Sequence, residues 1–156
     1  TRIQWEPNEE RLWVGAAGEV KSGTVLDGSL LSFSPERGGW EPSPITEQRL
    51  GGDFMDFSFI SENTGVALVM SAVGPAKVGT QLVRFDREPG VGTQTVLRSD
   101  TYQFAQILWI ESIERLFVAD RNPARPGIRV LDKRLNEEAF LPTESQPIEM
   151  VWLDNR

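Results

Sequence analysis

Four polar residues occur at one fixed offset inside otherwise apolar segments of the chain. Each lies three positions before an aromatic residue: Arg2 before Trp5, Asp56 before Phe59, Gln106 before Trp109 and Glu149 before Trp152. Brought together as a ring, two carboxylates, an amide and a guanidinium could hold a hard cation or a small polar ligand. The oxygen atoms of Asp56 and Glu149 favour Ca²⁺ or Mg²⁺ over Zn²⁺. The alternative interpretation is that the four side chains only hydrate a water-filled channel.

A second set of charged residues lies in three segments, 17–28, 72–80 and 120–126. Each segment joins the second and third apolar segments of one copy of a repeat described below. These segments carry four cations, Lys21, Lys77, Arg121 and Arg125, and three acids, Glu19, Asp27 and Asp120. If the segments share one rim, its slight positive charge predicts a site for an anionic group or an acidic partner. The alternative is that these cations are only solvated. Trp40 is the tryptophan that we expect to be exposed enough to bind a ligand.

The elements that must position these residues recur along the chain. The aromatic residues Trp5, Phe59, Trp109 and Trp152 follow one another at intervals of 54, 50 and 43 residues, and each lies near the end of a short apolar segment. A second apolar segment starts six residues after each of the first three, at Arg11, Gly65 and Arg115. Third segments at 30–34, 82–86 and 128–132 and more polar fourth segments at 45–50, 94–98 and 138–141 complete the copies. A period near 50 in copies rich in strand-forming residues indicates propeller blades rather than helical repeats.

The third copy carries the most specific motif. Arg115-Leu-Phe-Val-Ala-Asp120, followed by Gly127-Ile-Arg-Val-Leu-Asp132, resembles a blade of the YVTN/NHL-type β-propellers, and the segment 146–154 resembles the innermost strand of such a blade. The resemblance implies a single all-β domain with three four-stranded antiparallel blades at about residues 1–50, 51–98 and 99–142, plus the innermost strand of a fourth at 146–154. Closed propellers have four to eight blades. We therefore expect a second chain, or the remainder of the same polypeptide, to complete the ring.

The composition excludes several classes of site. The 156 residues include no histidine and no cysteine, which rules out disulfides, thiolate chemistry and histidine-based triads or zinc sites. The formal net charge of −7 argues against nucleic acid as a partner. No apolar run reaches the length of a membrane span. Of the five tryptophans, we expect Trp5, Trp13, Trp109 and Trp152 in the core.

The sequence therefore predicts a β-propeller segment that acts as a binding or scaffold module and presents loops to a protein or small-molecule partner. The alternative is a subunit or fragment of a propeller enzyme, a hydrolase, a lactonase or a quinone-type dehydrogenase, with a divalent cation in the central channel. Because relatives of this repeat type are often exported and the chain starts at Thr1, we expect a periplasmic or extracellular location.

Overall fold

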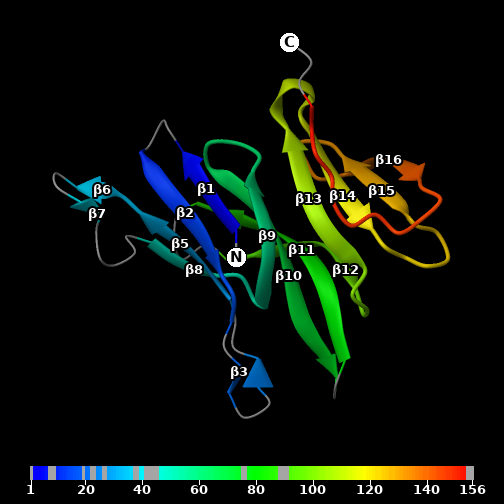
Figure 1. Ribbon diagram of the computed structural model, residues 1–156, viewed down its shortest axis with the longest axis horizontal. Helices are drawn as coiled ribbons and strands as arrows, with labels where there is room; N and C mark the ends of the chain where they lie inside the picture. The colour runs from blue at the N-terminus through cyan, green and yellow to red at the C-terminus, as the bar shows by residue number, and fades with distance from the viewer. Residues whose placement is uncertain are drawn as a thin grey trace.

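The computed structural model describes residues 2–6, 10–18, 20–21, 24–25, 28–36, 39–40, 46–74, 77–87 and 92–153. It is an all-β structure with three four-stranded antiparallel sheets, which follow one another from left to right in Figure 1. This architecture is compatible with a β-propeller-like fold, although the described residues do not close a ring. The three sheets confirm the all-β prediction.

Each sheet is built from strands that pair with their neighbours in chain order. The first sheet contains β1 (Arg2–Glu6), β2 (Arg11–Ala16), β5 (Ser29–Phe33) and β8 (Thr46–Arg49). The second contains β9 (Asp53–Phe59), β10 (Thr64–Gly74), β11 (Lys77–Asp86) and β12 (Gln94–Ser99). The third contains β13 (Phe104–Ile110), β14 (Arg115–Asp120), β15 (Gly127–Leu131) and β16 (Glu137–Pro142). Two small hairpins, β3 (Val20–Lys21) with β4 (Thr24–Val25) and β6 (Pro35–Glu36) with β7 (Gly39–Trp40), and one 3₁₀ turn, η1 (Glu111–Ile113), complete the described elements.

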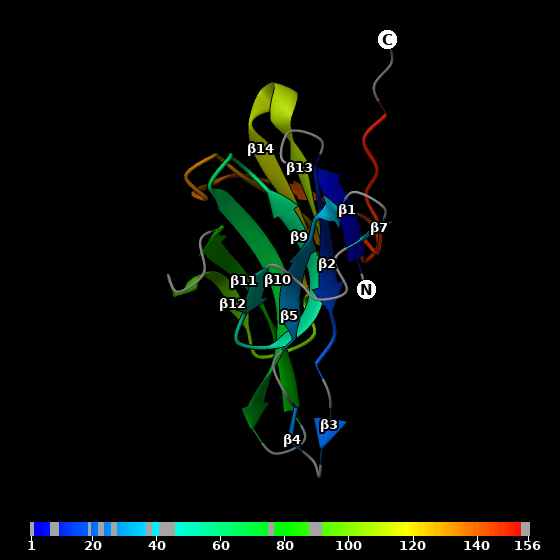
Figure 2. The same cartoon turned by 90° about the vertical axis from the view of Figure 1, so that its left-hand side faces the viewer.

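Two of the three expected loops contain paired strands. The prediction of a loop at 72–80 is wrong, because β10 and β11 stay paired there: Ala72 pairs with Val78 and Gly74 with Lys77. The predicted loop 17–28 contains the β3–β4 hairpin. The β-branched residues of both segments favour an extended backbone, which is why the strands continue beyond the apolar core. The tip of β10–β11 and the β3–β4 hairpin lie at the same end of the molecule (Figures 1 and 2).

The register of the second sheet also differs from the repeat expected from the sequence. Arg11 pairs with Glu6 and Arg115 with Ile110, one position after the aromatic residue, whereas Gly65 pairs with Phe59 itself. The connection between these paired residues is therefore one residue longer in the second sheet. Because side chains alternate across a strand, this single residue decides which of its side chains face the first sheet.

Neighbouring sheets pack face to face, and the two sheet–sheet interfaces are built in the same way. We call the face of a sheet that points to the next sheet along the chain its forward face, and the opposite one its rear face. Trp13 and Leu30 on the forward face of the first sheet pack with Ala67, Val69, Val83 and Phe85 on the rear face of the second. Val66, Leu68 and Leu82 on the forward face of the second pack with Ile107, Leu116, Val118 and Leu131 on the rear face of the third. Two cores of the same kind thus join three sheets.

Among the described elements, no further four-stranded sheet packs against the rear face of the first sheet. Pairing in register places six apolar side chains on it, namely Ile3, Val14 and Leu31 in one row and Trp5, Leu12 and Phe33 in the next. Ile3 is 63% exposed and Trp5 45% exposed, and the other four are half-buried. The placement of Trp5 in the core was therefore wrong, because no described sheet precedes the first one.

The segment 146–153 is extended alongside the third sheet but forms no strand ladder, which corrects the expected innermost strand at 146–154; residue 154 lies outside the described part. A strand needs a hydrogen-bonded neighbour, and none of the described strands pairs with this segment. Its apolar side chains are exposed, among them Ile148 and Trp152, so that Trp152 is also not a core residue. Trp13 is fully buried, as expected, and Trp109 packs partly buried against the second core.

Candidate functional site

Three of the four polar residues predicted to form a ring lie on the first strand of each sheet, Arg2 on β1, Asp56 on β9 and Gln106 on β13. We call these three edge strands the inner strands. Glu149 lies in the segment 146–153, outside the sheets, and of the four only Arg2 and Asp56 form an ion pair among the described residues. A guanidinium nitrogen of Arg2 lies 2.5 Å from Oδ1 of Asp56. The carboxylate of Asp56 also accepts the backbone N–H of Phe57 at 2.9 Å and, through Oδ2, that of Ile107 at 3.0 Å. Burial raises the pKa of Asp56 above its usual value, and the Ile107 N–H and the charge of Arg2 oppose that rise. Asp56 thus joins β9 to both β1 and β13.

Gln106 makes the corresponding connection one copy later. Its Oε1 accepts the backbone N–H of Met150, and its Nε2 donates to the Met150 carbonyl at 3.3 Å. Ile107 and Met150 both lie two positions before an aromatic residue of the repeat, Trp109 and Trp152. The same side-chain position therefore binds the same backbone position of the following segment twice, once as Asp56 and once as Gln106.

These contacts do not fit a calcium or magnesium site. Both oxygens of Asp56 already accept hydrogen bonds from protein donors, and a cation would have to compete with the guanidinium of Arg2. Glu149 is exposed, and the described residues contain no group of three or more acidic side chains placed to hold a metal ion. The chain's own donors thus use both oxygen atoms of Asp56, one of the two residues on which the metal prediction depended.

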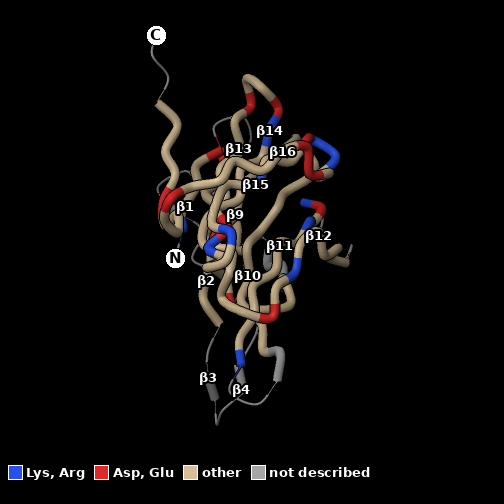
Figure 3. Tube along the Cα trace, turned by 90° about the vertical axis from the view of Figure 1, so that its right-hand side faces the viewer, with Lys and Arg blue, Asp and Glu red and all other residues tan. Residues whose placement is uncertain are grey.

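The cations predicted for a binding rim are held differently from one another. The guanidinium of Arg125 lies 4.2 Å from the centre of the Phe140 ring, and that of Arg121 lies 5.4 Å from the Tyr102 ring and 3.4 Å from Oε1 of Gln146. Lys77 is exposed at the start of β11. The side chains of Lys21 and Trp40 lie outside the described part of the structure. Figure 3 shows Lys and Arg positions interspersed with Asp and Glu positions along the described chain.

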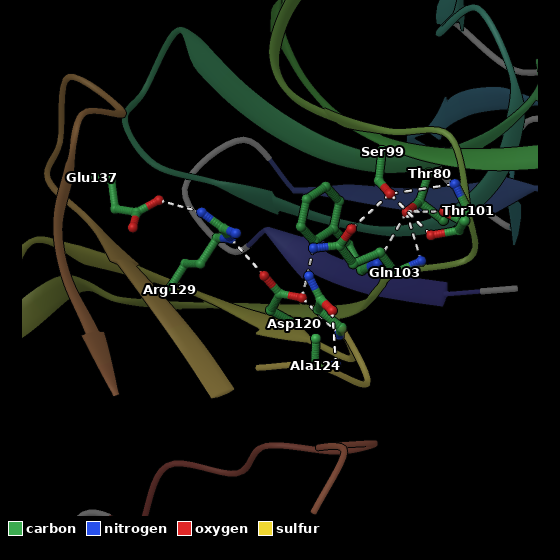
Figure 4. A network of polar contacts seen from close by, with 10 residues as sticks. Thr80, Ser99, Thr101, Gln103, Asp120, Ala124, Arg129 and Glu137 are labelled. Atoms are coloured by element: carbon green, nitrogen blue, oxygen red, sulfur yellow. Dashed lines mark hydrogen bonds and ion pairs between the residues drawn. The ribbon is translucent and has the colours of Figure 1, made fainter. Parts of the chain in front are cut away.

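Asp120, an acid of the predicted rim, is instead fully buried at the centre of a polar network (Figure 4). Its carboxylate accepts hydrogen bonds from Nε2 of Gln103 at 2.8 Å and from Nε of Arg129 at 2.7 Å. Arg129 also forms an ion pair with Glu137 at 2.6 Å. Thr80 of the second sheet accepts the backbone N–H groups of Gln103 and Phe104. The network fixes the end of β14 and joins the second and third sheets, which is a structural task.

A hollow among the described residues lies where the inner strands of the three sheets end. Its volume is about 800 Å³, within the range of small-molecule sites. It is lined by Arg87, which follows β11, and by the ends of β1, β9 and β13 with the residues that follow them: Gln4, Trp5, Glu6, Ser58, Phe59, Ile60, Ser61, Glu62, Trp109 and Glu111. Two indole rings and three carboxylates thus surround one space.

The wall of the hollow already contains a bound cation, the guanidinium of Arg87. It lies 4.2 Å from the centre of the Phe59 ring and 5.7 Å from that of Trp13, and it forms an ion pair with Glu6. Glu6 is in turn hydrogen-bonded to the indole N–H of Trp13 at 3.0 Å. Arg87 is only 8% exposed, so this combination of aromatic rings and a carboxylate holds a largely desolvated charge.

The sequence patterns described above did not predict a site at this hollow. A signal was present, since a glutamate follows each of the first three aromatic positions within three residues, as Glu6, Glu62 and Glu111. Arg87 gave no such signal, because it reaches the hollow from the end of β11, and only the packing of the first two sheets brings it to Glu6.

Comparison of the chain with protein-family models, with curated proteins and with solved structures found no match. Within the described residues, no helix is long and apolar enough to cross a membrane.

Proposed function

We propose that the chain is a β-propeller segment that acts as a binding and scaffold module, and that its uncovered sheet face receives a further four-stranded sheet. The observation that carries the proposal is the repeated packing of a forward face on a rear face. The rear face of the first sheet, with exposed Ile3 and Trp5, has the same apolar character as the two rear faces that are covered. An apolar sheet face of this extent favours burial against a partner.

The contacts between inner strands support the same arrangement. Asp56 binds the backbone of β13 and Gln106 binds that of the segment 146–153, so each copy holds the one that follows it. Repeat proteins gain most of their stability from such nearest-neighbour interfaces. The partner sheet would come from a second chain or from the remainder of the same polypeptide.

Native mass spectrometry of the purified material, with its denatured mass beside it, tests the proposal. We expect a complex heavier than the single-chain mass of 17.5 kDa. Replacing Leu31 by Glu on the uncovered rear face should dissociate the complex, since a charge without a partner is costly to bury. Gln94→Glu, at an exposed position of β12, is the matched control and should leave the complex intact. A folded species found only at 17.5 kDa at every concentration would overturn the proposal.

A further inference from the structure

We propose that the hollow at the ends of β1, β9 and β13 binds an organic cation, an alkylammonium or guanidinium group on an apolar stem. The volume of about 800 Å³ accommodates such a group. The lining combines indole rings, whose faces attract cations, with carboxylates that carry the opposite charge. This site goes beyond the proposed scaffold function and shares only Trp5 with the uncovered sheet face.

Acidic side chains outnumber basic ones in the described lining of the hollow. Among the described residues, three carboxylates, those of Glu6, Glu62 and Glu111, line it together with one cation, Arg87. The ion pair of Arg87 with Glu6 neutralises one carboxylate, which leaves Glu62 and Glu111 on the exposed side of the lining. The hollow therefore carries an excess of negative charge and favours a cationic occupant over an anionic one.

The guanidinium of Arg87 shows which kind of group the lining of the hollow can hold. A cation between aromatic rings and beside a carboxylate is stable enough here to be almost fully buried. Trp5 and Trp109 with Glu62 and Glu111 repeat that composition around the open part of the hollow. A second cation of the same chemistry can thus be held by the same kinds of interaction.

The arrangement of the lining residues favours an organic cation over a metal ion as the ligand. Among the described residues, no three acidic side chains are close enough to one another to share a metal ion. Carboxylates spread around a wide hollow that also contains indole rings instead suit a bulky cation, which contacts the rings through its apolar surface.

Titration with choline, followed by NMR of the five tryptophan indole N–H groups, tests the site. We expect the signals of Trp5 and Trp109 to move and that of Trp152, which is exposed but outside the lining, to stay. The neutral isostere 3,3-dimethylbutan-1-ol should bind at least about five-fold more weakly, because it keeps the shape and loses the charge.

The double variant Glu62→Gln/Glu111→Gln should weaken choline binding about five-fold. Both positions are exposed, so the fold should be unaffected. Glu144→Gln, at an exposed position outside the hollow, is the matched control and should bind as the parent does. Neither glutamate of the double variant lies on the rear face of the first sheet, so the variant should leave the complex seen by mass spectrometry intact, and the two proposals can fail separately.

A second arm uses the peptide acetyl-Gly-Arg-Gly-amide, which presents the same chemistry from a protein source. Tighter binding of the peptide identifies a basic side chain of a partner protein as the occupant, and tighter binding of choline identifies a free ligand. Equal binding of choline and its neutral isostere would overturn the proposal. So would unmoved signals of Trp5 and Trp109 at about 10 mM choline, ten times the Kd of a weak millimolar ligand.

Discussion

At the scale of single residues, the polar side chains of the inner strands connect sheets to one another. Asp56 is nearly buried and accepts hydrogen bonds from two backbone N–H groups and from Arg2. Gln106, at the same position of the next copy, both accepts from and donates to the backbone of Met150, which an amide side chain can do and a carboxylate cannot. A polar residue inside an apolar strand is retained here because the backbone of the next strand needs an acceptor.

Replacing Asp56 by Ala should lower the free energy of unfolding by about 1–3 kcal/mol, because the buried N–H of Ile107 loses its acceptor. Replacing Arg2 by Ala should cost less than about 1 kcal/mol, since the Arg2 side chain is 40% exposed and its ion pair is screened by water. Urea denaturation of the two variants measures both values. A larger loss for Arg2→Ala would contradict this assignment of roles.

At the scale of elements, the turns decide how strands are aligned. Between its paired residues Phe59 and Gly65, the connection into β10 is one residue longer than the corresponding connections into β2 and β14. This sets which side chains of the second sheet face the first. The turn between β15 and β16 is built on Asp132, whose carboxylate accepts the backbone N–H of Asn136 at 2.8 Å and its side-chain amide at 3.1 Å. Leu135 adopts the left-handed conformation, with φ of 67°, inside this turn.

The β15–β16 turn should loosen in acid. Hydrogen bonds from the backbone and side chain of Asn136 lower the pKa of Asp132 below 3.8, so the charged form is favoured in the folded turn. Their contribution is present above that pH and is lost as the pH falls through the lowered pKa. An NMR titration of the Asn136 amide should show a midpoint below 3.8. Asp132→Asn keeps an acceptor but cannot titrate at this position, so it should remove the transition, and a midpoint at or above 3.8 in the parent would refute the prediction.

At the scale of the whole molecule, three similar sheets are not equally covered. The second sheet lies between the other two and has a core on both faces. Among the described residues, the first sheet has a buried core only on its forward face. The segment 146–153, which follows the third sheet, is exposed. Stability should therefore be concentrated at the two interfaces of the second sheet.

Leu68 and Leu31 provide a matched comparison of covered and uncovered faces. Leu68→Ala, between the second and third sheets, should cost about 2–5 kcal/mol, because it leaves a cavity in a closed core. Leu31→Ala should cost clearly less in dilute solution, where a partner sheet dissociates from the half-buried rear face. Chemical denaturation at low protein concentration measures both losses. Equal losses would mean that the rear face is already covered within the chain.

Local sequence patterns were sufficient to predict the main strands. Apolar runs that end at Trp5, Phe59 and Trp109 and the polar turns between them predicted four strands in each copy, because strand formation depends on nearby side chains. The same patterns failed where pairing continues beyond the core, as in the β10–β11 ribbon, and where no partner strand is present, as in the segment 146–153.

The sequence by itself determined the all-β class, the positions of the main strands and the burial of Trp13. Only the tertiary structure decided that Trp5 and Trp152 are exposed, that Asp56 and Gln106 hold neighbouring segments, and that Arg87 meets Glu6 across the interface of the first two sheets. The physical reason is that alternation along a strand assigns a side chain to a face. Whether that face is covered, and by which residues, depends on sheets that are distant in the sequence.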